Sequence, residues 1–296
     1  MKLVTYNIRF GLGKDHSHSL HRIADAVRGA DVIALQEVRR SWPSDYADQP
    51  VEIGALLPDY YWVYGPAFDV DASRKTADGN VENHRRQFGT MLLTKTPIMS
   101  SRLHIFPKLA AVSHFNMDLG ALEGVIQTPA GYVQFYSIHL SHLTSRERVM
   151  QINHFLDIHR RAWREGGAWC GAGNCGDVDW SAGEPMPPMP LEAVVMGDFN
   201  CEKDTPEYEL MAGKKDYQFG YVAYIDSFVD SWEAAGNGDQ ELNSWTHDSM
   251  ASGWGSARLD YCFISPSLAG KVKNAWVDND ALGSDHQPYW VELDLS

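Results

Sequence analysis

Hydrophobic and polar positions at the start of the chain predict a strand, a helix and a second strand. Residues 3–6 alternate in the manner of a strand, and the apolar run at residues 32–35 is typical of a buried strand. Between them, Ser19 can cap a helix that Gly29 ends. The apolar side chains of that helix share one face and are Leu20, Ile23, Ala24 and Val27.

The same patterns predict mostly strands in the rest of the chain, with three further helices. We expect strands around residues 60–64, 88–94, 111–116, 121–127, 132–140, 191–197, 258–264 and 286–293. We expect helices around residues 51–57, 145–164 and 205–211. Residues 166–190 are rich in Gly and Pro without any period, so we expect a long surface loop there. No repeat or other linker divides the chain, and we expect a single domain over residues 1–296.

The charge and hydropathy of the chain indicate which classes of binding partner are favoured. The formal net charge is −14 and the pI is near 5.2, and no compact run of Lys and Arg offsets the acids. A protein with this charge does not bind nucleic acid mainly through release of counterions from the phosphate backbone. Nucleic acid is therefore a less favoured substrate, although it is not excluded. The chain shows no secretory signal, and no apolar run reaches the length of a membrane span. We therefore expect a cytoplasmic protein without a transmembrane segment.

Polar side chains follow several apolar segments at the point where each segment ends. The clearest case is VVMGDFN at residues 194–200, since the interior of a strand disfavours Gly, Asp and Asn. Asp198 and Asn200 at this end indicate a functional edge, and Gly197 before them allows close backbone approach to a ligand. Comparable ends carry Asn7, Glu37, His139, Asp260, Asp285 and His286. If these strand ends converge at one edge of a sheet, the side chains form a single site.

Acids, an amide and a histidine at these ends suit hydrolysis of a phosphate ester. A hard divalent cation prefers oxygen ligands, which Glu37, Asn7 and Asp285 can supply to Mg²⁺ or Mn²⁺. Water that attacks phosphorus needs a base near neutral pH. A histidine whose second ring nitrogen is held by a carboxylate is suited to that role, here His286 with Asp260.

Donors for the phosphate group are predicted at three positions. His139 and Asn200 can hydrogen-bond to the phosphate oxygens on which charge develops. Arg86 lies in the run NHRRQFG, just before a predicted strand, and arginine recognises phosphate through its planar fork. A solvated loop is an equally good interpretation of that run, just as Asp198 and Asn200 taken alone are typical of a turn.

Six short blocks in a fixed order, TYNI, QEV, SIHL, GDFN, RLDY and SDH, resemble the signature of the DNase-like endonuclease/exonuclease/phosphatase superfamily. The blocks run from residue 5 to residue 286, and each lies at or beside the end of a predicted strand. Each block alone is a weak signal, but six in one order are poorly explained by chance. The resemblance implies an α/β (α+β) fold, a four-layer sandwich of two mixed β-sheets packed face to face with helices outside. It also implies divalent-metal-dependent cleavage of a phosphate ester.

The resemblance further implies a role for each matched residue. Asn7 and Glu37 match metal-site positions, and Asp285 matches a position beside or on the metal. His139 and Asn200 match phosphate-contacting positions, Asp198 an acid near the nucleophile or leaving group, Asp260 the acid that orients the base, and His286 the base. Some members carry an Asp two residues after the first Asn, where this chain has Arg9, so the number of protein ligands stays open. Phosphatases, phospholipases and secreted nucleases more often have a histidine at the position of His139, and the site looks like that of bacterial members of general phosphohydrolase type.

The leading hypothesis is therefore a metal-dependent phosphatase or phosphodiesterase that acts on a small-molecule or lipid-linked phosphate ester. The enzyme alternative is a metal-dependent DNA or RNA nuclease, and the non-enzyme alternative is a binding module that has kept the fold. The intact set of site residues argues against the binding module. Loop aromatics can stack on bases or sugars, lie against lipid, or merely cover the ends of sheets. They include Trp42, Tyr46, Trp180, Trp245 and Trp254.

Overall fold

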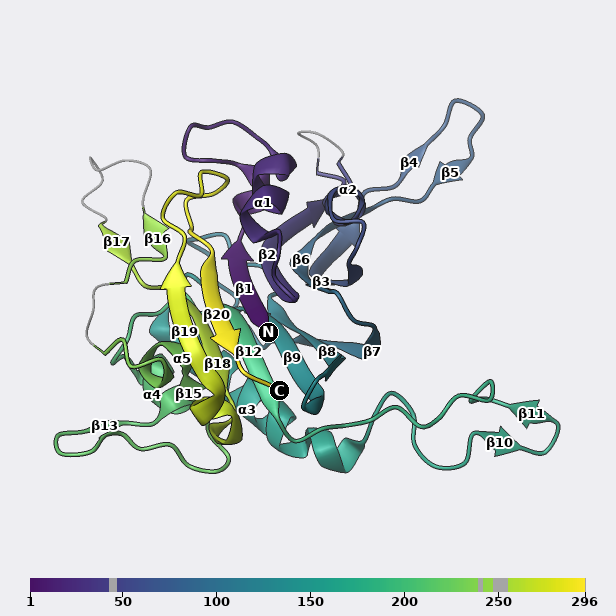
Figure 1. The fold of residues 1–296 in the computed structure, drawn as a ribbon. Coiled ribbons are helices and arrows are strands. Elements are labelled where there is room, and N and C mark those ends of the chain that lie inside the picture. Colours follow the sequence, from purple (N-terminus) through teal and green to yellow (C-terminus); the bar gives the residue numbers. More distant parts are fainter. Residues whose placement is uncertain (43–46, 239–241, 247–254, 296) are drawn as a thin grey trace.

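Two six-stranded β-sheets packed face to face form the centre of the molecule (Figure 1). The structure is a computed structural model, and it describes residues 1–42, 47–238, 242–246 and 255–295. Two of the loop aromatics singled out above, Tyr46 and Trp254, lie outside the described residues.

Both sheets are mixed, with one parallel pair of strands in each. The first sheet has the order β19-β20-β1-β2-β6-β3, with β1 and β2 parallel. Its strands are β1 (Lys2–Asn7), β2 (Val32–Arg40), β3 (Tyr61–Asp71), β6 (Arg85–Thr94), β19 (Val272–Val277) and β20 (Tyr289–Leu293). The second sheet has the order β15-β18-β12-β9-β8-β7, with β9 and β12 parallel. Its strands are β7 (Ile98–Ile105), β8 (Gly120–Thr128), β9 (Gly131–His139), β12 (Ala193–Asp198), β15 (Val229–Asp230) and β18 (Asp260–Ile264).

Helices cover the outer faces of both sheets and complete four layers (Figure 1). They are α1 (Leu20–Val27), α2 (Gln49–Leu56), α3 (Ser145–Glu165), α4 (Pro206–Ala212) and α5 (Ser231–Ala234), with 3₁₀ turns at Arg9–Gly11 and Pro266–Lys271. Ile23 of α1 and Ile53 of α2 pack on the first sheet, whereas Phe155 of α3 and Met211 of α4 pack on the second. The predicted fold, two mixed sheets face to face with helices outside, is confirmed.

The central strands are buried on both faces, which explains their uninterrupted apolar runs. Leu3 and Ala34 of the first sheet meet Phe135 and Met196 of the second in one fully buried cluster. The alternate side chain Val4 points the other way, into the cluster beneath α1 and α2. Each buried aliphatic or aromatic side chain stabilises the fold by roughly 1.5–3 kcal/mol through removal of apolar surface from water.

Most predicted elements are present with shifted ends, and one predicted strand is wrong. Ser19 caps α1 as expected, since its side chain accepts a hydrogen bond from the Arg22 amide at 3.3 Å. Residues 111–116 form no strand and belong to the loop between β7 and β8. Glu147 of α3 holds that loop by accepting hydrogen bonds from the Leu109 amide at 3.1 Å and from Asn116 Nδ2 at 2.9 Å. The side-chain pattern of this segment did not reveal that it has no neighbouring strand.

The pattern also missed β7 and β19, which are edge strands of the two sheets. Their side chains are mostly half-buried or exposed, and the apolar residues neither alternate with polar ones nor form an uninterrupted run, so no strand pattern marks either segment. Two-residue strands form four further pairs. They are β4 (Arg74–Lys75) with β5 (Val81–Glu82), β10 (Asn174–Cys175) with β11 (Val178–Asp179), β13 (Lys215–Asp216) with β14 (Gly220–Tyr221), and β16 (Trp245–Thr246) with β17 (Ser256–Ala257).

The hairpins β4–β5 and β10–β11 project from the sandwich, as Figure 1 shows. The β10–β11 pair is the regular structure within residues 166–190, the segment predicted as a surface loop, and Trp180 in it is 79% exposed. Among the described residues, no helix combines the length and the apolar character that a bilayer crossing requires.

The His159 side chain on α3 gives an expected pH dependence of stability. Burial among aromatic rings, including Phe228 at 4.9 Å between centroids, lowers the pKa of His159 to about 4. Between pH 6.5 and pH 4 the His159 side chain is protonated in the unfolded chain but stays neutral in the folded protein. The free energy of unfolding therefore decreases as pH falls from about 6.5 towards 4. His159→Phe keeps an aromatic ring without the titration. We expect the free energy of unfolding, measured with urea, to decrease by about 1–2 kcal/mol more in the wild type than in this variant when pH falls from 7.5 to 5. Equal losses would contradict the assignment.

Candidate active site

The ends of the two parallel strand pairs, one pair from each sheet, meet at the same edge of the sandwich. Asn7 is the last residue of β1, and His139 and Asp198 are the last residues of β9 and β12, where they lie in register. Because β18 runs antiparallel to β12, its first residue, Asp260, lies opposite Asp198. Parallel strands deliver their carboxyl ends to one edge, so side chains from distant parts of the chain meet there.

Glu37 and His286 reach the same edge through irregular backbone. The pairing of β2 with β6 shifts register between Leu35 and Val38, and Glu37 within this irregularity has a φ of 61°. A bulge of this kind re-aims a side chain at the cost of strained backbone. Asp285 and His286 lie a few residues before β20, which runs antiparallel to β1 and therefore starts near the end of β1. The structure thus brings the predicted residues Glu37, Asp285 and His286 to the edge that holds Asn7 and Asp198.

Asn7 links the carboxylates of the two sheets. Its Nδ2 donates hydrogen bonds to Glu37 Oε1 at 3.1 Å and to Asp198 Oδ2 at 2.9 Å. Its Oδ1 accepts the backbone amide of Arg9 at 3.0 Å, which leaves one lone pair of that oxygen for another partner. In this structure Asn7 therefore organises the two acids, and its oxygen keeps limited capacity for a metal ion.

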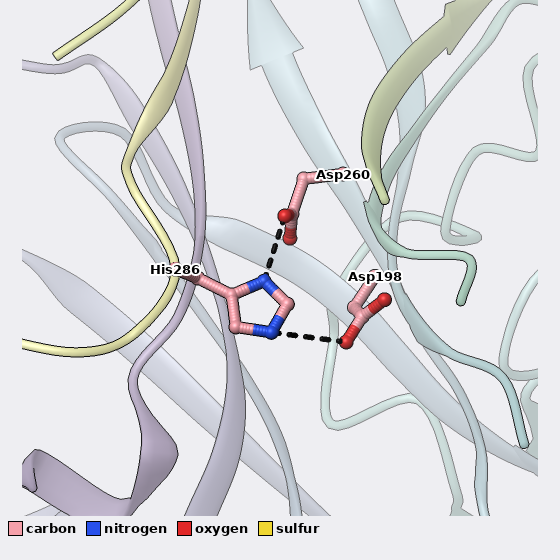
Figure 2. Close-up of side chains that lie close together, drawn as sticks. All are labelled: Asp198, Asp260 and His286. Carbon is pink, nitrogen blue, oxygen red and sulfur yellow. Dashed lines mark hydrogen bonds and ion pairs between the residues drawn. The ribbon is translucent and has the colours of Figure 1, made fainter. Parts of the chain in front are cut away.

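His286 lies between two aspartates, each facing one of its ring nitrogens (Figure 2). Its Nδ1 is 2.8 Å from Asp260 Oδ2, and its Nε2 is 3.8 Å from Asp198 Oδ2. His139 Nε2 approaches the same oxygen of Asp198 at 3.7 Å. The predicted pairing of His286 with Asp260 is present, and it fixes the orientation of the ring.

The buried charges shift the pKa values of these groups in different directions. Burial raises the pKa of Asp198 to about 7, although His286 nearby lowers it. Burial alone would lower the pKa of His286, but Asp260 and Asp198 outweigh burial and raise the pKa to about 10. Burial, with a contribution from His286, lowers the pKa of His139 to about 3, so His139 is neutral at pH 7. Two histidines within reach of Asp198 therefore carry different charges.

His139 and Asn200, the predicted phosphate contacts, both line the space beside Asp198. In the part of the chain that the structure describes, His139 Nδ1 is buried and has no hydrogen-bond partner. The backbone N–H of Asn200 donates to Asp198 Oδ1 at 2.8 Å, and the side-chain Nδ2 of Asn200 donates to the Leu140 carbonyl oxygen at 2.9 Å. The structure gives Gly197 a role other than the close approach to a ligand that the sequence suggested. A β-carbon there would collide with the carbonyl oxygen of Ile138, so this glycine allows close approach of β9 and not of a ligand.

A cavity of about 1230 Å³ opens along this edge. Glu37, His139, Asp198, Asn200, Asp285 and His286 line it, together with the aromatic residues Phe10, Trp42, Phe88 and Trp245. Arg86 does not line the cavity; its guanidinium lies 5.8 Å from the ring of Trp42, which does. The arginines in the lining are Arg9, Arg39 and Arg148, which sequence reasoning did not select. Arg9 directly follows the TYNI block, and that position was the signal that could have identified it.

Carboxylates in this cavity fit a divalent cation. Glu37 and Asp285 both line it, and burial raises the pKa of Glu37, which shows that its negative charge lacks full compensation. Asp260 Oδ1 is buried and has no hydrogen-bond partner among the described residues. Asp198, Asp260 and His286 also offer ligand atoms that all lie within 4.8 Å of one another. Oxygen donors of this kind suit a hard cation.

Comparisons with known proteins agree with this geometry. A family model described as the Endonuclease/Exonuclease/phosphatase family matches residues 4–286. No curated protein matches the chain significantly. Among solved structures, an endonuclease/exonuclease/phosphatase from Beutenbergia cavernae has a TM-score of 0.65 at 20% identity, covering 99% of this chain and 71% of that one. The mannosyl-6-phosphatase Bt3783 of Bacteroides thetaiotaomicron has a TM-score of 0.61 at 17% identity, covering 99% of each chain.

Truncated TDP2 of Caenorhabditis elegans has a TM-score of 0.58 at 19% identity, covering 99% of this chain and 96% of that one. At these identities the structural matches establish the fold, whereas the family match extends from the first strand to His286. Endonucleases, exonucleases and phosphatases all hydrolyse phosphate esters. The chain belongs to the endonuclease/exonuclease/phosphatase family.

Proposed function

We propose that this protein is a divalent-metal-dependent hydrolase of small-molecule or lipid-linked phosphate esters, a phosphatase or phosphodiesterase. The observation that carries this proposal is the convergence of Glu37, Asp285, His286 and His139 on one cavity of about 1230 Å³. A cavity of that volume accommodates a ligand of metabolite size. The acidic net charge of −14 disfavours a polyanionic substrate. A structurally similar protein, Bt3783, is a mannosyl-6-phosphatase, which is consistent with a phosphate monoester.

Glu37 and Asp285 would hold Mg²⁺ or Mn²⁺, with Asn7 as a third oxygen donor. When bound, the cation polarises the phosphoryl group and neutralises negative charge that develops on its oxygens. His139 and Asn200 then hydrogen-bond to the same phosphoryl group from the side of β9 and β12. Arg86 stays a predicted phosphate contact, although its guanidinium lies 5.8 Å from the ring of Trp42 and Arg86 itself does not line the cavity.

His286 is proposed to accept a proton from the attacking water at Nε2. Asp260 holds Nδ1 at 2.8 Å, so Nε2 is the nitrogen that faces the cavity and Asp198. Without a cation the pKa of His286 is about 10, because Asp260 and Asp198 outweigh burial. A cation held by Asp285 would oppose protonation of His286 and so lower this pKa, which would favour the neutral imidazole that acts as base. Asp198, at 3.8 Å from Nε2, either positions the water or assists the leaving group.

A metal-dependent nuclease is the second candidate, because the family includes nucleases and because Trp42 and Trp245 line the cavity, where they can stack on bases. Activity assays with a panel of substrates distinguish the phosphatase or phosphodiesterase from the nuclease. With Mg²⁺ or Mn²⁺, we expect turnover of at least one phosphorylated sugar, polyol or lipid head group, loss of that turnover with a chelator, and no nicking of plasmid at low salt. Plasmid nicking without turnover of any small ester would establish the nuclease instead. Absence of divalent-ion binding would favour a non-catalytic module.

Replacement of His286 tests the proposed base. We expect His286→Ala to lower kcat by about 10²–10⁴-fold, the range typical of general acid–base catalysis, and also to lower thermal stability, because the buried Asp198 and Asp260 lose a partner. His21→Ala is a suitable control, since His21 is exposed on α1. The measurement is kcat with the best substrate of the panel, beside a thermal melt of each variant. Near-wild-type kcat in folded His286→Ala protein would refute the role.

Replacement of Asp260 tests the electrostatics of the same histidine. Because the Asp260 carboxylate raises the pKa of His286, Asp260→Asn should lower that pKa from about 10 by about 2 pH units in the metal-free protein. Asp285→Asn is the matched control, because Asp285 raises the same pKa less than Asp260 does. NMR titration of the His286 ring measures the pKa of His286 in each of the two variants directly. An equal or larger decrease in Asp285→Asn would contradict the assigned order.

A further inference from the structure

Arg9 lies where the proposed metal-binding carboxylates gather, and the predicted roles leave it unexplained. Its Nε is 3.6 Å from Asp285 Oδ2. It also lines the cavity beside Glu37 and His286, and it is one of the charges that act on Glu37. A guanidinium is always charged and is less strongly hydrated than an ammonium group, so it can keep a permanent positive charge in a partly buried site.

The backbone at Arg9 is strained and firmly held. Arg9 and Phe10 have φ values of 42° and 45°, a left-handed region that non-glycine residues rarely occupy. The turn is fixed at both ends, because the Arg9 amide donates to Asn7 Oδ1 at 3.0 Å and the Leu12 amide donates to the Arg9 carbonyl at 2.8 Å. Strain that is kept in place at a site is a sign that the side-chain position matters.

Donors already surround one oxygen of Asp285. Trp245 Nε1 is 3.4 Å from Asp285 Oδ2, the same oxygen that Arg9 approaches, whereas Ser284 Oγ is 3.3 Å from Oδ1. In two-metal sites the cations lie about 3.5–4 Å apart and share carboxylate ligands. An oxygen that faces a guanidinium and an indole N–H is poorly placed to bind a second cation. The fixed charge of Arg9 also repels such a cation.

We propose that Arg9 occupies the place of a second divalent cation, so that the site holds one metal ion and Arg9 supplies the other positive charge. This inference rests on the proposed metal-dependent function. Arg9 holds Asp285 in position for the single ion and adds a permanent positive charge to the wall of the cavity in which the phosphate is bound. The rival arrangement has a second ion at Asp198, Asp260 and His286, whose ligand atoms lie within 4.8 Å of one another. That group is less suited to a second ion here, because the hydrogen bond between His286 Nδ1 and Asp260 Oδ2 already uses one donor atom of each residue and leaves Asp260 with Oδ1 alone.

Counting bound Mn²⁺ tests the proposal without reference to activity. Isothermal titration calorimetry and EPR of the full chain should give one Mn²⁺ per wild-type molecule, with no spin coupling between ions. Arg9→Asp replaces the cation with a carboxylate and should bind two ions with a spin-coupled signal. Arg9→Met removes the charge and frees Asp285 Oδ2, so it should bind a second ion about 10-fold or more weakly than the first. Arg39→Met is the matched control, since Arg39 lines the same cavity but lies over the ring of Phe10, and it should bind one ion.

The outcomes separate this inference from the proposed function. Wild-type protein that binds no Mn²⁺ would remove the metal-dependent function itself. Wild-type protein that binds two ions, or Arg9 variants that bind one ion as the wild type does, would overturn the role of Arg9 and leave the function intact. Thermal melts show whether each variant is folded. If Arg9→Asp does not fold, the count for the wild type and for Arg9→Met decides the question.

Discussion

A buried hydrogen bond between the two sheets, from Asn7 Nδ2 to Asp198 Oδ2 at 2.9 Å, is the contact on which the site depends. It joins the end of β1 to the end of β12 and thereby fixes how the two sheets are aligned at this edge. Below it, Gln36 Nε2 donates to Ser137 Oγ at 3.1 Å, and Ser137 Oγ donates to the Leu35 carbonyl at 3.2 Å. Apolar packing between sheets has little directional preference, whereas these buried polar contacts are costly to break and so specify one alignment.

The same edge concentrates negative charge, which folding alone does not neutralise. Asp198 and Asp260 are almost fully buried, and Glu37 is partly buried beside them. Burial of carboxylates is costly unless opposite charges or hydrogen-bond donors surround them. Asn7, His286 and Arg9 supply part of this compensation, and a divalent cation would supply the remainder. The arrangement is therefore understandable as a binding site whose stability and ligand affinity are linked.

The sequence predicted the strand ends of the site well because those residues are placed by the regular geometry of β1, β9 and β12. Asn7, His139 and Asp198 follow apolar runs that can be recognised without coordinates. Parallel pairing brings His139 and Asp198 together, and packing of the two sheets brings Asn7 to them. The walls of the cavity were less predictable. Arg148 comes from α3 and pairs with Glu207 of α4 at 2.9 Å, a contact that depends on helix packing and not on strand periodicity. The strand predicted at residues 111–116 was wrong for a related reason, since the conformation of this loop depends on hydrogen bonds to Glu147, far along the chain.

This division between strand ends and walls bears on specificity. The family match and the structural matches at 17–20% identity show that the sandwich tolerates extensive change in sequence. Asn7, His139 and Asp198 lie at the ends of strands whose position the core fixes, so loop changes leave them in place. Arg39, Trp42, Asn116, Arg148 and Trp245 line the rest of the cavity and come largely from the ends of elements and from connections between them. Because such segments vary without disturbing the core, the walls are the part of the cavity in which proteins that share this fold can differ in ligand choice.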